Sequence, residues 1–89
     1  MQTAVIEIDL DGRAVGVPRE VVTAIAAAAA ARAGVSARHR ELSLQLNRAL
    51  DAGHVSLGRG EVRALVVVLK EEHPDRFGPA AAELLRAAA

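Results

Sequence analysis

Histidines are the side chains of this sequence best suited to metal binding or acid–base chemistry, and there are three: His39, His54 and His73. None has a second histidine at the i, i+4 spacing that sets two ligands on one helix face, and no cysteine can complete a zinc site. His39 and His73 fall on apolar stripes of expected helices, which predicts satisfied core or boundary histidines. We therefore predict no metal site.

Acidic residues alternate near the N-terminus, in Glu7-Ile8-Asp9-Leu10-Asp11-Gly12. Oxygen-bearing side chains at alternate positions, with glycine at the sixth, resemble the opening of a calcium-binding EF-hand loop. The twelfth position, which needs a bidentate glutamate, is Pro18, and the flanking residues are typical of strands rather than helices. The run is therefore interpreted as a solvent-facing hairpin, and no cofactor or bound ion is predicted.

No serine or glycine motif supports catalysis. Ser36, Ser43 and Ser56 lack the flanking glycines of a nucleophile elbow. The segment 58–60 lacks the later Gly-Lys pair of a phosphate-binding loop. Because no nucleophile and base are paired in so short a chain, we predict no catalytic residue and a protein that is not an enzyme.

The composition predicts one small domain over residues 1–89. Hydrophobic residues make up 52% of the chain, but Phe77 is its one aromatic residue, so the core must be largely aliphatic. The formal net charge is zero, which does not indicate a generally basic, nucleic-acid-binding surface. The N-terminus lacks the pattern of a signal peptide, and the longest apolar run, 24–31, is too short to cross a bilayer. A cytoplasmic protein without membrane contact is expected.

Residues 4–17 are expected to form a β-hairpin. Apolar and polar residues alternate up to Asp11-Gly12, a strong two-residue turn signal. Folding at that turn pairs Leu10 with Arg13 and carries the larger apolar side chains of both strands to one face, namely Ile6, Ile8, Leu10, Val15 and Val17. Because an isolated hairpin is marginally stable in water, this face must lie on helices, or the hairpin must pair through an edge with another chain.

Four helices are expected after the hairpin, over residues 18–33, 36–52, 58–73 and 79–88. Pro18 suits the first position of a helix, and Ser36 suits an N-cap. Gly34 and Gly53 are placed to cap the ends of the first two helices. Residues 54–57 are expected to be a linker. The predicted fold is α+β, an N-terminal hairpin packed on a small bundle of three to four helices.

The segment 58–73 is expected to be the helix against which the others pack. The competing interpretation is a buried strand, since Val66–Val68 is a β-branched run. Glu61 in the first turn favours the helix. Its apolar stripe is predicted to hold Val62, Leu65, Val66, Leu69 and His73, which leaves Val67 and Val68 among the charged residues.

Some apolar residues lie outside the predicted buried stripes of the helices. Leu44 lies between Arg40 and Arg48 and is expected to be exposed, as is Val67. The alanine-rich face of helix 18–33 permits either an exposed surface or a close helix crossing, within the subunit or between subunits. The predicted partner-interface residues are Leu44, Val67, Ala26 and Ala30.

Charge is unevenly distributed along the chain. Residues 32–48 hold four arginines against Glu41 alone. These arginines can simply form a solvent-exposed helix face without a binding role. The functional interpretation is a basic patch that binds nucleic acid or an acidic partner. Arg38, Arg40 and Arg48 are the candidate nucleic-acid contacts.

The segment 13–52 resembles the ribbon–helix–helix repressors and antitoxins. The resemblance is carried by the strand and helix start Val15-Gly16-Val17-Pro18-Arg19-Glu20-Val21-Val22, by Gly34-Val35-Ser36, and by the leucine spacing of the following helix. It implies two chains that pair their strands and read the DNA major groove. The sequence departs from that pattern, because few basic residues lie on the strand and the turn at residues 11–12 gives it a partner in its own chain.

The function predicted from the sequence is a non-catalytic protein-interaction or oligomerisation module, a homodimer or an accessory or regulatory subunit of a larger assembly. The surplus apolar residues and the small core are the basis of this prediction. The alternative is a small dimeric DNA-binding regulator.

Overall fold

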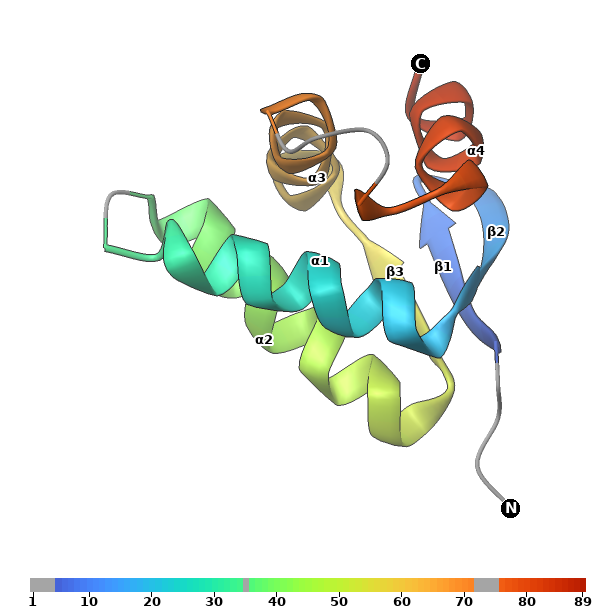
Figure 1. The fold of residues 1–89 in the computed structure, drawn as a ribbon, viewed down its shortest axis with the longest axis horizontal. Helices are drawn as coiled ribbons and strands as arrows, with labels where there is room; N and C mark the ends of the chain where they lie inside the picture. The colour runs from blue at the N-terminus through green and yellow to red at the C-terminus, as the bar shows by residue number, and fades with distance from the viewer. Residues whose placement is uncertain (1–4, 35, 72–75) are drawn as a thin grey trace.

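A computed structural model describes residues 5–34, 36–71 and 76–89 and shows the predicted α+β fold. A three-stranded sheet packs with four helices (Figure 1). The elements in chain order are β1 (Val5–Leu10), β2 (Arg13–Pro18), α1 (Arg19–Ala31), α2 (Ala37–Ala52), β3 (His54–Leu57), α3 (Arg59–Glu71) and α4 (Pro79–Ala88).

The hairpin forms in the predicted register. Leu10 pairs with Arg13 and Ile8 with Val15, antiparallel. The turn residues Asp11 and Gly12 have φ angles of 55° and 100°. Glycine adopts a positive φ without strain, and aspartate is among the few other residues that tolerate it in a hairpin turn. The Asp9 carboxylate accepts a hydrogen bond of 2.7 Å from the Gly12 amide. One of the acidic residues of the calcium-like run therefore stabilises the turn.

The segment 54–57 is a strand, and its prediction as a linker was wrong. It pairs with β1 in parallel, so that the sheet order is β2-β1-β3, with Ile8 beside Val55 and Leu10 beside Leu57. The Glu7 amide donates to the Gly53 carbonyl at 3.0 Å where β3 begins. A strand of four residues has too few alternations to be recognised alone, and its parallel partner lies more than forty positions earlier.

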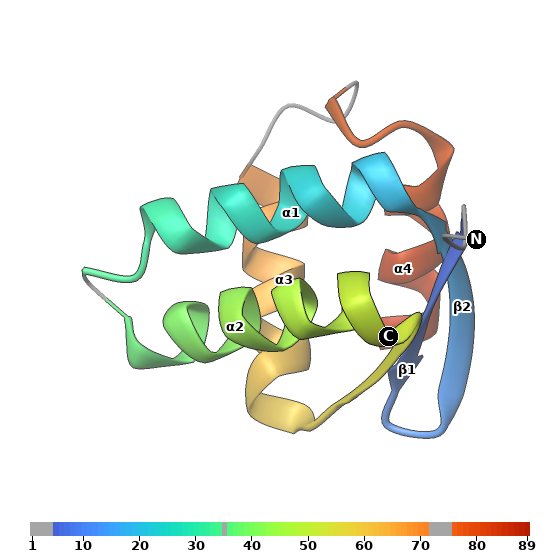
Figure 2. The ribbon, with the colours of Figure 1, turned by 90° about the horizontal axis from the view of Figure 1, so that it is seen from below.

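The core lies between the inner face of the sheet and the helices. The large side chains of that face, Ile6, Ile8, Leu10 and Val17, are buried, and Phe77 lies in the core. Figures 1 and 2 show α4 above β1 and β2, with α1 and α3 farther along the molecule and α2 beside β3. The main core residues of the helices are Val22, Ile25, Leu42, Leu46, Leu65, Val68, Leu69 and Leu84.

Helices α1 and α2 pack closely through small side chains. Ser43 is buried, and its hydroxyl donates to the Ala26 carbonyl at 3.1 Å. Ala26 is 3% exposed, so it is unavailable to a partner, although it was a predicted interface residue. Of the two interpretations of the alanine-rich face, the structure shows a crossing within the subunit at Ala26.

Two of the three predicted caps are present. The Ser36 hydroxyl accepts from the His39 amide, and Gly53 ends α2 with a φ of 86°. The prediction for Gly34 was wrong, because α1 ends at Ala31 and Arg32 takes the C-cap position in a right-handed conformation. Arg32 also forms an ion pair with Glu71, which joins the C-terminal ends of α1 and α3.

Helix α3 buries a different stripe from the predicted one. Val68 is fully buried, whereas Val62 and Val66 are half-buried, and His73 lies outside the described residues. The helix lies against α1 and α2 on one side and α4 on another, so its covered arc includes residues that a single-face pattern assigns to solvent. Within the described residues, no helix has the length and hydropathy that crossing a bilayer requires.

Candidate interaction surface

The remaining predicted interface residues are exposed but do not form one surface. Leu44 is 47% exposed on α2 and Val67 is 37% exposed on α3. Helix α3 packs on the side of α2 that carries Gln45, whose amide donates to the Glu61 carboxylate at 3.0 Å. Figure 2 shows α1 and α2 side by side, with α3 crossing behind them. Leu44 therefore lies away from α3, and Ala30 is exposed on α1.

The candidate nucleic-acid residues are all exposed on α2 but lie on two sides of it. Arg40 and Arg48 are two turns apart on the side of Leu44. Arg38 lies about 200° around the helix from Arg40, on the side that faces α3, where its side chain lies against Gly60. These arginines therefore do not form a continuous basic patch.

The two described histidines occupy contrasting places. His54 is exposed at the start of β3, beside Glu7 of β1. His39 is half-buried, and both ring nitrogens are shielded from water with no hydrogen-bond partner. The prediction of a satisfied histidine was therefore wrong for His39. The described part of the chain has no cluster of three or more histidine, aspartate or glutamate side chains suited to a metal ion.

Replacing His39 with leucine is expected to stabilise the protein. A buried polar group without a partner costs about 1–3 kcal/mol, and an apolar side chain of similar size removes that cost. We expect His39→Leu to raise the free energy of unfolding by about 1 kcal/mol, measured by urea denaturation. His54→Leu, at an exposed position, is the matched control and should change it little. A loss of stability in His39→Leu comparable to that of a core truncation would contradict this account.

The outer face of the sheet is open to solvent, in keeping with the solvent-facing hairpin predicted from the acidic run. It carries Glu7 and Asp9 from β1, Ala14 and Gly16 from β2, and His54 and Ser56 from β3. All but the half-buried Asp9 are exposed, and Val5 at one end is 48% exposed. Helices α1, α3 and α4 lie on the opposite face (Figures 1 and 2).

Strand β2 forms one edge of this sheet, and β3 forms the other. Strand β2 pairs only with β1 and lies at the end of the molecule away from α2 and α3, and α1 begins directly after its last residue (Figures 1 and 2). Leu10 and Arg13 close a two-residue turn and so form a hydrogen-bonded pair. The alternation of an antiparallel ladder then directs the N–H and C=O groups of Ala14 and Gly16 outward. Among the described residues, neither Ala14 nor Gly16 has a hydrogen bond on that side.

This edge lacks the usual protection against strand addition. Proteins guard edge strands with lysine, central proline, a bulge or a covering helix. In β2 the outward positions hold alanine and glycine, and Pro18 stands only at the end of the strand. Another strand can therefore approach the backbone of Ala14 and Gly16 without meeting a large side chain.

A cavity adjoins each end of β2. At the Pro18 end, a cavity of about 530 Å³ lies between β2, α1 and α4. Its charged lining residues are Glu20, Glu83 and Arg76, above an apolar wall that includes Val21 and Phe77.

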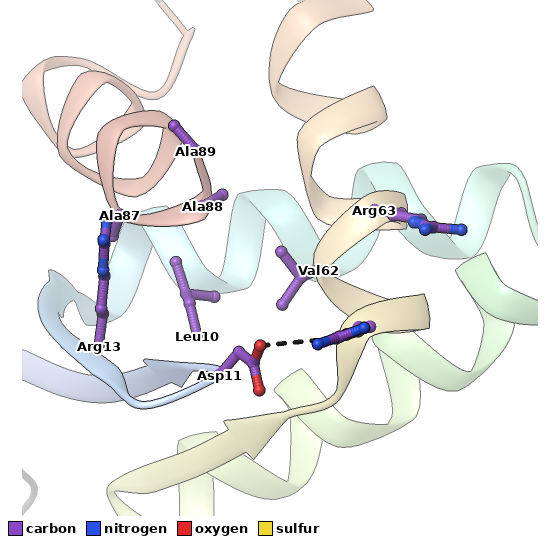
Figure 3. A pocket seen from close by; sticks show the side chains of 9 residues that line it. Leu10, Asp11, Arg13, Val62, Arg63, Ala87, Ala88 and Ala89 are labelled. Carbon is purple, nitrogen blue, oxygen red and sulfur yellow. Dashed lines mark ion pairs between the residues drawn. The ribbon is translucent and has the colours of Figure 1, made fainter.

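At the Arg13 end, a cavity of about 370 Å³ opens between the turn, α3 and α4. Figure 3 shows Arg13 beside Ala87 and Leu10 and Val62 within the cavity. Asp11 and Arg59 approach each other to 3.7 Å across its rim. Arg59 is 85% exposed, so this ion pair is weak.

The edge of β2 is suited to recognising the backbone of another chain rather than to covalent chemistry. An open strand edge supplies alternating donors and acceptors that suit an added strand. The small residues of Ala14-Val15-Gly16 were the available signal in the sequence, but their meaning depends on β2 being at the edge. Comparison with protein-family models, with curated proteins and with solved structures finds no match to this chain.

Proposed function

We propose that this protein is a non-catalytic protein-interaction module that binds a β-strand of another polypeptide chain along the free edge of β2. The observation that carries the proposal is the pair of outward-facing, unpaired backbone segments at Ala14 and Gly16. Addition of a strand satisfies these groups and extends the sheet. The absence of large side chains at both positions supports a direct approach.

This proposal replaces the predicted surface of Leu44, Val67 and Ala30 with one defined by backbone geometry. Single exposed apolar residues on separate helix faces are common on protein surfaces and give no shared contact area. The edge of β2, by contrast, is one continuous element. The alternative of a DNA-binding regulator is less well supported, because Arg38 lies apart from Arg40 and Arg48 and because Glu41 and Asp51 are also exposed on α2.

Ala14→Lys should strongly weaken association through this edge. A lysine on an edge strand places a charge and a long side chain where the added strand must lie. We expect formaldehyde cross-linking in the producing cells to give discrete adducts of the tagged wild-type protein, and these adducts to be reduced about tenfold or more in Ala14→Lys. The measurement is denaturing electrophoresis with detection of the tag.

Ala31→Lys is the matched control. It adds the same reactive amine at an exposed position, at the far end of α1 from β2 (Figure 2). Its adducts should equal those of the wild type. Equal adduct patterns in all three proteins, or no adducts in any of them, would remove the β2 edge as the binding surface.

A further inference from the structure

We propose that the added strand is β2 of a second copy of this chain, so that the two sheets join in a symmetric dimer in which Arg13 of each copy meets the acidic cavity of the other. This inference rests on the proposed function and names its partner. It depends on three properties of β2: which backbone groups face outward, which side chains flank them, and how charge is distributed along the strand.

The register follows from the outward-facing groups. A two-fold axis that passes at Val15 sets Ala14 of one copy opposite Gly16 of the other, and the symmetry repeats this pair. In each pair both residues direct N–H and C=O toward the new neighbour, so each pair exchanges both backbone hydrogen bonds. The same residues that are unpaired in the single chain are therefore satisfied together.

Side chains on both faces tolerate this approach. On the outer face, the new ladder is flanked by the methyl group of Ala14 and by Gly16, beside which the Val5 side chain of β1 lies. On the inner face, Val15 is half-buried and meets Val15 of the second copy at the axis. Strands in a sheet are about 4.8 Å apart, so two valines directly opposite each other are in contact and cover their exposed part.

Charge is complementary in the antiparallel arrangement. An antiparallel partner brings the Arg13 end of one β2 to the Pro18 end of the other, where the cavity of about 530 Å³ opens. Glu20 and Glu83 in its lining are exposed, and within the described residues neither they nor Arg13 forms an ion pair. Arg76 also lines the cavity, but it is already engaged in an interaction of its own.

A parallel partner would instead place Arg13 beside Arg13 and the acidic cavities beside each other. Such like-charge contacts oppose association, so electrostatics favours the antiparallel orientation. Because the axis repeats each contact, every dimer contains the Arg13-to-cavity contact at both ends of the joined strands.

Charge reversal tests the orientation. Purified wild type should sediment as a dimer at micromolar concentration. Arg13→Glu and Glu83→Arg should each raise the dissociation constant about tenfold or more, because each sets like charges together at both ends. The double variant Arg13→Glu, Glu83→Arg restores opposite charges and should return the dissociation constant toward that of the wild type. Both exchanged residues, Arg13 and Glu83, are exposed, and circular dichroism checks that the fold is retained.

The outcomes separate this inference from the proposed function. One outcome is that the wild type stays monomeric in sedimentation while cells still give edge-dependent adducts with a different protein. This result overturns the inference that the partner is a second copy, and it leaves the proposed interaction module standing. A dimer that persists unchanged in Ala14→Lys and in both charge reversals forms elsewhere and overturns this inference, and it overturns the proposed function as well if the cellular adducts of Ala14→Lys also equal those of the wild type. Protection of the Ala14 and Gly16 amides from hydrogen exchange at dimer-forming concentrations, and its loss on dilution, supports both.

Discussion

Phe77→Ala should remove most of the stability of this protein. Phe77 is 1% exposed and belongs to the core cluster, and it is the only aromatic residue of the chain. Truncation of a buried phenylalanine to alanine costs about 3–5 kcal/mol through lost burial and the cavity that remains. A domain of this size is stable by roughly 5–15 kcal/mol, so the loss is a large share of the total.

The size of this effect follows from where Phe77 lies. It precedes α4 and lines the cavity beside β2, so it helps to fix α4 above the sheet. Urea denaturation followed by circular dichroism measures the change, and a variant already unfolded in buffer agrees with it. Leu44→Ala, at an exposed position, is the control and should change the free energy of unfolding by less than about 0.5 kcal/mol. A loss below about 1 kcal/mol for Phe77→Ala would contradict the assignment of Phe77 to the core.

The hairpin could be predicted because its signals agree over a short distance. The Asp11-Gly12 turn fixes the register, and that register carries Ile6 and Ile8 to the same face as Val17. Two independent local patterns therefore specify one structure. The ends of α2 were predictable for the same reason, since Ser36 and Gly53 act on residues close to them in sequence.

Strand β3 and the buried stripe of α3 depend on distant contacts. The four residues of β3 become a strand because β1 offers them an edge, and this edge is known only once the fold is known. Val68 is buried because α3 contacts helices on more than one side. A periodicity analysis assumes one buried face, so it cannot identify a helix that is covered over a wider arc.

The candidate site could not be predicted from the sequence, for a related reason. Leu44 and Val67 are exposed as predicted, but exposure of single residues does not say which of them share a face. The small size of Ala14 and Gly16 was visible in the sequence, but their role lies in the backbone and not in the side chains. Their importance follows from the sheet order, which places β2 outside and β1 in the centre.

Ala26→Leu should destabilise the protein by forcing α1 and α2 apart. Ala26 is buried where the two helices meet, and its carbonyl accepts the hydrogen bond from Ser43 at 3.1 Å. A leucine at this position adds volume that a packed crossing cannot accept, which costs about 1–3 kcal/mol, and it also displaces Ser43 from its partner. We expect a loss of about 2–3 kcal/mol in the free energy of unfolding, measured by denaturation in urea.

Ala27→Leu separates packing from helix propensity. Ala27 is the next residue of the same helix and is exposed, so the same change there should alter stability by less than about 0.5 kcal/mol. If both variants were equally tolerated, α1 would not be held against α2 at Ala26. If only Ala26→Leu is destabilising, the alanine-rich helix serves a crossing inside the subunit, and association depends on another surface. That result would favour the edge of β2, because the alanine face would no longer be available to a partner.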